Sequence, residues 1–348
     1  MTGTRRPPDD GRRKRLLFLH TGGTLSMVRR TAPGPLEPEL YDHYLLPYVR
    51  GLEDLAHIDG RAIASLDSSD MRPDVWEAIA SQVAQDLGDY DGFVVLHGTD
   101  TMSYTATALS LMLQGLDRPV VLTGSQRPIA ELRSDARVNV VHAAICALRD
   151  IPEVSLYFGG ALFRGNRTTK ASITAYDAFA SPNFPPLLRA GVDIIPDAPP
   201  LVPAGPFRLV PGFDQRVAAL HMIPGAPPRG LEAMVDIGMR AVVLVTFGEG
   251  NIPLAEWPTA IRRAVDQGMA VVIVSQCMTG SARPGRYRGS LAAMDAGAIF
   301  GGDLTREAAI VKTMWLLGQG VEPAELAEFL VQPVAGECTP TEFLPAVV

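Results

Sequence analysis

Three short polar stretches, rich in hydroxyl groups, carboxylates and glycine, are the first candidates for chemistry. They are Thr21-Gly22-Gly23-Thr24, Asp67-Ser68-Ser69-Asp70 and His97-Gly98-Thr99-Asp100-Thr101. The first and third directly follow short apolar runs, Leu16–His20 and Phe93–His97, that are typical of buried strands. Because ligands of parallel α/β sheets bind beyond the carboxyl ends of the strands, we expect these polar residues to gather at one sheet edge.

The same stretches could instead be tight turns with helix caps, since Ser, Thr and Asp are preferred at helix N-termini. A glycine-containing turn after a strand could also receive a phosphate. The chain has neither G-x-G-x-x-G nor G-x-x-x-x-G-K-[ST] spacing, so both nucleotide-binding fingerprints are absent. The recurrence of hydroxyls and carboxylates in three such stretches favours a functional site.

A threonine hydroxyl in these turns needs a neighbouring base before it can act as a nucleophile. Lys170, which ends the stretch Arg164–Lys170, could serve if its surroundings disfavoured the ammonium form. Asp100 could orient the lysine, and Thr99 could relay a proton to an attacking water. Taken alone, Lys170 has the character of an ordinary surface lysine.

Strand-like and helix-like segments alternate along the chain and would position these residues. The expected strands are Leu16–His20, Phe93–His97, Pro119–Thr123, Ala241–Thr246 and Met269–Ser275. The expected helices are a segment beginning at Pro73, Thr101–Gln114, Ser134–Leu148, about Pro253–Asp266, and Thr305–Gly318. Strands separated by helices of this length predict βαβ units and a parallel sheet.

The predicted fold class is α/β with two domains. We expect a larger N-terminal domain, residues 16–195, with a parallel or mixed sheet flanked by helices. A disordered tail, residues 1–15, precedes it, and a linker, residues 196–215, follows it. Prolines crowd residues 181–213, which predicts a linker or an irregular connection. Residues 216–348 would form a smaller, parallel α/β C-terminal domain.

Composition excludes several classes of function. Of 348 residues, 31 are basic and 38 acidic, so the net charge of −7 argues against a nucleic-acid partner. No apolar run approaches the ~18 residues of a membrane span, and the N-terminus lacks a signal-peptide pattern. The three cysteines and six histidines show no metal-ligand spacing. We therefore expect a cytoplasmic protein with reduced thiols, no metal and no cofactor.

The polar stretches, with others between and beyond them, resemble the bacterial L-asparaginase family, more its cytoplasmic type I branch than its periplasmic type II branch. The matching motifs are Thr21–Thr24, Asp67–Met71, Asp91–Met102, Thr123–Gln126, Ala130–Asp135, Arg164–Lys170, Asp177–Asn183 and Gln276–Met278. The motif TGGT alone is weak evidence for this family. The motifs TGGT, HGTDTM and RGNRTTK in this order are highly specific for it. The resemblance extends from about Leu16 almost to the end of the chain.

The resemblance implies hydrolysis of L-asparagine by two-step acyl transfer, with a weaker glutaminase activity. Thr24 matches the nucleophile, and a second catalytic group comprises Thr99, Asp100 and Lys170. The substrate-binding residues that it implies are Gly23, Ser68, Ser69, Asp100 and Asn251. Asn251 matches a residue that reaches the site from a neighbouring subunit, so the resemblance also implies a homodimer or a homotetramer. Backbone N–H groups near Thr24 and Thr99 would stabilise the oxyanion.

Two positions depart from the family pattern. A loop tyrosine that bonds the nucleophile is missing, because residues 27–39 contain none; Tyr41 and Tyr44 are the nearest. Some type I members bind a second asparagine through an arginine, which is Val245 here, although Cys277 of that effector site is kept. We expect an altered substrate loop and an effector site that is lost or changed.

Three other functions remain open. The changed loop is compatible with an amidase or deamidase of a different small-molecule amide, or with a catalytically silent asparagine-binding sensor. An amidotransferase subunit acting on aminoacylated tRNA shares the family fold. It would normally carry an extra domain before the first turn, where this chain has 20 residues before Thr21.

Overall fold

The computed structural model describes residues 12–28, 37–38 and 48–340, which form two compact units. The first unit comprises the chain up to Gly165, Lys170–Ala180 and Pro185–Val210. The second comprises Asn166–Thr169, Ser181–Phe184 and the chain from Pro211 onward. The fold is α/β, with a large mixed sheet in the first unit and a parallel sheet in the second.

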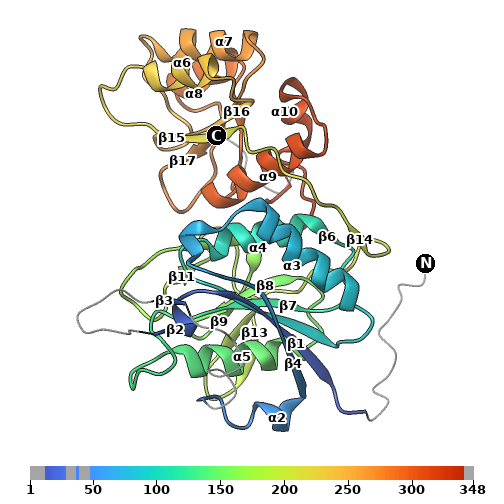
Figure 1. The fold of residues 1–348 in the computed structure, drawn as a ribbon. Coiled ribbons are helices and arrows are strands. Elements are labelled where there is room, and N and C mark those ends of the chain that lie inside the picture. The colour runs from blue at the N-terminus through green and yellow to red at the C-terminus, as the bar shows by residue number, and fades with distance from the viewer. Residues whose placement is uncertain (1–11, 29–36, 39–47, 341–348) are drawn as a thin grey trace. The chain divides into compact units, whose positions relative to one another are not determined.

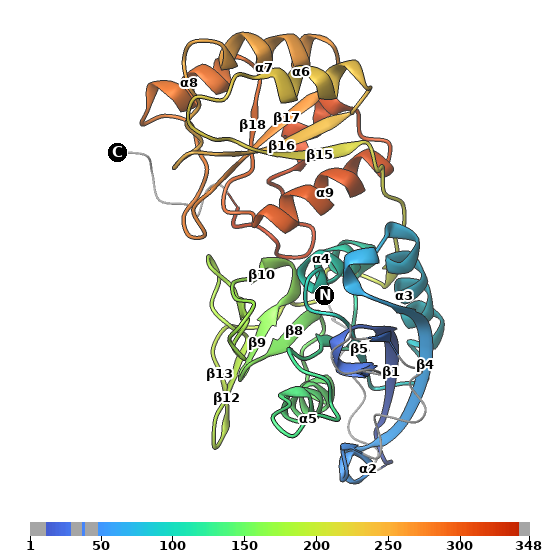
Figure 2. The same cartoon turned by 60° about the vertical axis from the view of Figure 1, so that its left-hand side comes forward.

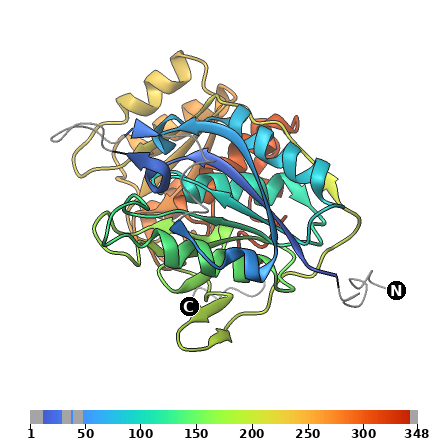
Figure 3. The ribbon, with the colours of Figure 1, turned by 60° about the horizontal axis from the view of Figure 1, so that its bottom comes forward.

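The first unit is built on an eight-stranded sheet in the order β13-β12-β9-β8-β7-β5-β1-β4. Its parallel part comprises β1 (Arg15–Gly22), β4 (His57–Leu66), β5 (Gly92–Leu96), β7 (Val120–Thr123) and β8 (Val154–Phe158). Its antiparallel part comprises β9 (Ala161–Arg164), β12 (Leu188–Ala190) and β13 (Ile194–Pro196). The long blue strands β1 and β4 run side by side in Figure 3.

Helices cover both faces of this sheet, which explains the continuous apolar runs of its strands. Helices α3 (Pro73–Asp86) and α4 (Met102–Met112) lie on one face, and α5 (Ala136–Ala147) lies on the other (Figures 1 and 2). The short α2 (Leu52–Leu55) contacts α5. Every residue of β5, β7 and β8 is buried. The expected strands and helices of this unit are therefore confirmed, to within a few residues at their ends.

Two parts of the sheet differ from the sequence-based expectation. The irregular connection predicted for residues 181–213 was wrong in part, because β12 and β13 lie there and extend the sheet. Pro196 is tolerated in β13 because this is an edge strand, where a missing N–H can face away from the sheet. The other edge strand, β4, was not predicted, because its half-exposed sequence mixes polar and apolar residues.

Short pairings complete the first unit. Within the proline-rich stretch, β14 (Arg208–Leu209) pairs with β6 (Leu113–Gln114). Strand β2 (Met27–Val28) pairs with β3 (Glu37–Pro38), and β10 (Thr169–Lys170) pairs with β11 (Phe179–Ala180). Of the expected tail, residues 1–11 lie outside the described part, whereas Arg12 forms an ion pair with Asp91 at 3.1 Å.

The second unit is a four-stranded parallel sheet, β15-β16-β17-β18, with helices on both faces (Figure 2). Its strands are β15 (Val217–His221), β16 (Ala241–Thr246), β17 (Ala270–Ser275) and β18 (Ile299–Phe300). Its helices are α6 (Arg229–Asp236), α7 (Trp257–Asp266), α8 (Arg288–Asp295), α9 (Arg306–Gly318) and α10 (Leu326–Phe329). Helices α6–α8 cover one face of the sheet and α9 covers the other. None of the helices in the described residues combines the length and apolar character of a membrane span.

A fully buried ion pair anchors the C-terminal segment to α9. The Lys312 ammonium lies 2.6 Å from a carboxylate oxygen of Glu337, and neither side chain is exposed to solvent. The same carboxylate accepts hydrogen bonds from the backbone N–H groups of Val334 and Ala335. Burial by itself would raise the pKa of Glu337, but the charge and hydrogen bond of Lys312, together with the two backbone hydrogen bonds, outweigh it and lower that pKa.

Replacing Lys312 by Met should destabilise the protein by about 3–5 kcal/mol, because Glu337 would stay buried without its counter-charge. Urea unfolding followed by circular dichroism measures the loss. The double variant Lys312→Met/Glu337→Gln leaves no buried charge and should lose less stability. Equal losses in the single and double variants would show that the unpaired charge is not what destabilises the single variant.

Candidate functional site

The turns that end β1 and β5 touch backbone to backbone. Gly22 and Gly23 have positive φ angles of 101° and 85°, a region that favours glycine. A Cβ on Gly23 would overlap the backbone of Gly98, and one on Gly22 would overlap the carbonyl of Leu66. The two glycines are thus required by close approach, and the expected gathering of the first and third polar stretches is confirmed.

The second polar stretch lies against the third. Ser68 is buried, and its hydroxyl accepts a hydrogen bond from the Asp100 N–H at 3.3 Å. The Thr101 hydroxyl donates to the Ser68 carbonyl at 2.8 Å. The capping interpretation is also correct in part, because Asp67 accepts bonds from the Ser69 N–H and hydroxyl at 2.8 and 2.9 Å. All three stretches therefore meet at the carboxyl ends of β4, β1 and β5.

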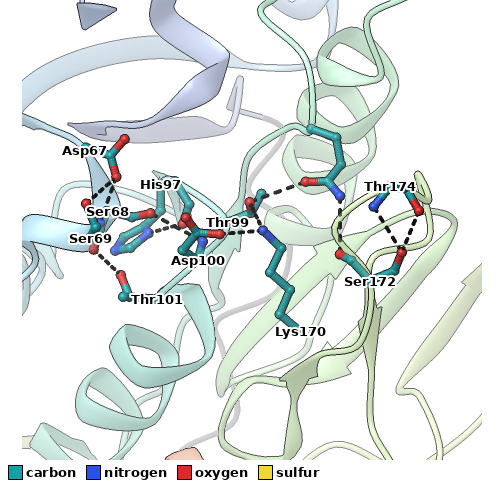
Figure 4. Close-up of polar contacts among 12 residues, drawn as sticks. Asp67, Ser68, Ser69, His97, Thr99, Asp100, Thr101, Lys170, Ser172 and Thr174 are labelled. Carbon is teal, nitrogen blue, oxygen red and sulfur yellow. Dashed lines mark hydrogen bonds and ion pairs between the residues drawn. The ribbon is translucent and has the colours of Figure 1, made fainter. Parts of the chain in front are cut away.

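Lys170 joins this cluster from β10. Its Nζ donates to the Thr99 hydroxyl at 2.7 Å and to a carboxylate oxygen of Asp100 at 2.6 Å (Figure 4). The lysine side chain is only 16% exposed, whereas that of Asp100 is 63% exposed. A proton could pass directly between Nζ and the Thr99 oxygen, because the distance is that of a hydrogen bond. The structure thus brings together the three residues of the expected second catalytic group.

Gln126 is a member of the cluster to which the sequence analysis gave no role. Its side-chain oxygen accepts a 3.4 Å bond from the Thr99 hydroxyl, and its NH₂ group donates to the carbonyls of Ser172 and Ala175. The Asp135 carboxylate accepts from the Gln126 N–H and holds the loop. Gln126 lies just beyond the carboxyl end of β7, so the rule that ligands bind beyond strand ends could have identified it.

Two buried histidines lie directly before the glycine turns. In β1, His20 Nδ1 accepts a 3.1 Å bond from the Gly22 N–H. After β5, His97 Nδ1 lies 2.6 Å from the Gly98 carbonyl oxygen. Burial lowers the pKa of each ring to about 4, because the imidazolium would lose its hydration. Both rings are therefore neutral at pH 7.

The remaining candidates are Thr24, Asn251 and two tyrosines outside the described residues. Thr24 begins the 3₁₀ turn Thr24–Ser26 next to Gly23, and its side chain is half-buried. Asn251 lies in the second unit, in a turn where its N–H donates to Phe247. Tyr41 and Tyr44 lie outside the described residues, as does the substrate-loop stretch at residues 29–36.

The residues of the expected effector site lie in the second unit. Val245 is buried in β16, where it cannot bind a ligand's charge. Cys277 is exposed and lines a pocket with Thr169, Arg306 and Glu307. Among the described residues, no group of three or more metal-ligating side chains could hold a metal ion.

Comparison with known proteins gives matches over almost the whole chain. The family model "Asparaginase, N-terminal" matches residues 15–199, and "Glutaminase/Asparaginase C-terminal domain" matches residues 216–330. The chain is 39% identical over 339 residues to L-asparaginase 1 of Escherichia coli strain K12, covering 95% of this chain and 99% of that protein.

Solved structures of two L-asparaginases are among those that share the fold. The thermostable L-asparaginase from Thermococcus kodakarensis superposes with a TM-score of 0.87 at 33% identity, covering 93% of this chain and 99% of that one. L-asparaginase I from Vibrio cholerae gives a TM-score of 0.84 at 36% identity, covering 94% and 100%.

The neutral histidines predict a loss of stability in acid. Their pKa values rise from about 4 in the folded chain to 6.5 on unfolding, so the unfolded state takes up protons first as the pH falls. Each ring therefore destabilises the protein by up to about 3 kcal/mol between pH 6.5 and 4. The free energy of unfolding, measured with urea across this pH range, should fall as the pH is lowered. The fall should be shallower in the His20→Gln variant. The exposed His221→Gln is the control, and a fall equally shallow in both variants would contradict the assignment.

Proposed function

Because the chain belongs to the asparaginase family and is an asparaginase-type amidohydrolase, we propose that it hydrolyses L-asparagine to L-aspartate and ammonia through a threonine acyl-enzyme. The observation that carries the proposal is the contact of the Lys170 ammonium with both Thr99 and Asp100, beside the turn that carries Thr24. A shielded amine next to a threonine hydroxyl is the type of base that such a nucleophile needs.

In the first step, the Thr24 oxygen forms a bond to the carboxamide carbon of the substrate. The hydroxyl proton passes to the Thr99–Lys170 pair, and a proton then goes to the departing nitrogen. The carbon–nitrogen bond breaks, ammonia leaves, and the substrate remains as an ester on Thr24. The proton that the Thr99–Lys170 pair gains in this step is the one returned to the leaving group.

In the second step, the same pair activates water. The water oxygen attacks the ester carbon while Lys170 takes a proton by way of Thr99. The ester bond to Thr24 then breaks, the threonine oxygen recovers a proton, and aspartate is released. Gln126, which accepts from the Thr99 hydroxyl, supports the orientation of this hydroxyl in the resting state.

The polar groups around the reacting threonine suit an α-amino acid. The exposed Asp100 carboxylate would bind the substrate's ammonium group, and Ser68 and Ser69 would bind its carboxylate. The Gly23 N–H donates to the Leu66 carbonyl at 3.0 Å, so Gly23 serves the substrate by leaving space rather than by donating. The Thr24 and Thr99 N–H groups would then stabilise the oxyanion, each by roughly 3 kcal/mol.

We also infer where the enzyme acts and how its subunits assemble. We place it in the cytoplasm, with a weaker activity on glutamine. A homodimer or homotetramer would let Asn251 of one subunit complete the site of its neighbour. Light scattering of the purified chain, combined with the activity of an Asn251→Ala variant, decides whether a subunit contact is needed.

Purified protein should release ammonia from L-asparagine, and Thr24→Ala should reduce kcat by about 10³-fold or more because the acyl-enzyme cannot form. Thr24→Ser is the matched control and should keep part of the activity, since it retains the hydroxyl. Ammonia release is measured with a panel of amides. Activity only on another amide would favour the alternative amidase, and binding of asparagine without turnover would favour a sensor.

The saturation curve for asparagine should be hyperbolic, because Val245 cannot hold the carboxylate of a second asparagine. Initial rates over a wide substrate range measure its shape. A sigmoidal curve that becomes hyperbolic in a Cys277→Ser variant would show that an effector site persists at the pocket of Cys277.

A further inference from the structure

A chain of three buried hydrogen bonds ends at the backbone of the third polar turn. Trp76 Nε1 lies 2.9 Å from the Thr105 hydroxyl oxygen, which lies 2.8 Å from His97 Nε2. His97 Nδ1 lies 2.6 Å from the Gly98 carbonyl oxygen. Trp76 is 6% exposed, while Thr105 and His97 are completely buried. All three side chains are buried, so their donors and acceptors must match one another.

The direction of this chain is fixed at its Gly98 end. An indole N–H can only donate, so the Thr105 oxygen accepts from Trp76 and its own proton is free to go to His97. A carbonyl oxygen can only accept, so His97 Nδ1 must carry the proton that faces Gly98. A neutral imidazole has a single N–H, which leaves Nε2 as the acceptor for Thr105. The Gly98 end therefore fixes the tautomer of His97, and the Trp76 end is compatible with it.

This tautomer controls the orientation of one peptide group. The carbonyl of Gly98 and the N–H of Thr99 belong to the same planar, trans peptide and point in opposite directions. Holding the carbonyl against the buried His97 ring therefore turns the Thr99 N–H to the other side. Glycine allows many peptide orientations, so Gly98 needs an external contact to select one.

We propose that His97 is a positioning residue, whose Nδ1–H, directed by Thr105 and Trp76, holds the Gly98–Thr99 peptide so that the Thr99 N–H faces the oxyanion. The inference rests on the proposed function, in which this N–H stabilises the charge that develops on the substrate oxygen. A buried histidine that only fills the core would have no effect on the reaction beyond that on stability.

The tautomer can be tested without any catalytic assay. Nitrogen-15 NMR of the histidine-labelled protein at pH 7 distinguishes a protonated Nδ1 from a protonated Nε2, and a His97→Gln spectrum assigns the signal. We expect a protonated Nδ1 and a bare Nε2 at His97. A protonated Nε2 would overturn the inference, whatever substrate the protein hydrolyses.

The catalytic consequence can be tested at Thr105. Thr105→Val keeps the shape but removes the proton that fixes His97, and Thr105→Ser keeps that proton. In Thr105→Val, kcat should fall about 10–100-fold with KM within about threefold, because oxyanion donors act mainly in the transition state. Thr105→Ser should retain most of kcat. An unchanged kcat in Thr105→Val, or an equal loss in both variants, would overturn the inference.

A second pair of variants, at His97, keeps the inference testable if a Thr105 variant fails to fold. Asn and Leu have nearly the same shape, but only Asn offers an N–H where Nδ1 lies. We expect His97→Asn to keep a higher kcat than His97→Leu at similar melting temperatures, and equal kcat values would contradict the inference. A wild-type protein that releases no ammonia from asparagine would instead refute the proposed function, while the NMR result still decides the tautomer.

Discussion

The site depends on the close contact of two backbone turns at the ends of neighbouring parallel strands. Strands β1 and β5 pair in parallel, so both end at the same edge of the sheet. Gly23 and Gly98 then approach so closely that neither turn has room for a side chain at the point of contact. The turn that carries Thr24 and the turn that carries Thr99 are thereby brought into contact by backbone packing.

Around that contact, the polar groups are arranged by distant parts of the chain. The Ser68 hydroxyl comes from the end of β4 on the other side of β1, and Gln126 comes from the end of β7. Lys170 arrives from β10, some 70 residues after the groups that it contacts. Because one ammonium bonds both a hydroxyl and a carboxylate, it links the proton-transfer group to the group proposed to hold the substrate's charge.

Buried, neutral side chains support these turns at a cost to acid stability. His20 and His97 each remove a polar ring from water and bond the backbone of a glycine turn. Their lowered pKa values follow from lost hydration, so the same burial that fixes the turns makes the fold sensitive to protons. The buried Lys312–Glu337 pair in the second unit likewise relies on a partner to compensate lost hydration.

The sequence by itself determined the buried strands, the long helices and the residue types of the site. Continuous apolar runs such as Phe93–Leu96 identify strands covered on both faces, and the ordered motifs identify the family. The sequence did not predict the edge strands β4 and β13 or the neighbouring β12, because strands partly open to water carry no continuous apolar pattern. Nor could it give a role to Gln126 or fix the tautomer of His97. Those depend on which groups meet across long sequence separations, and only the tertiary structure decides that.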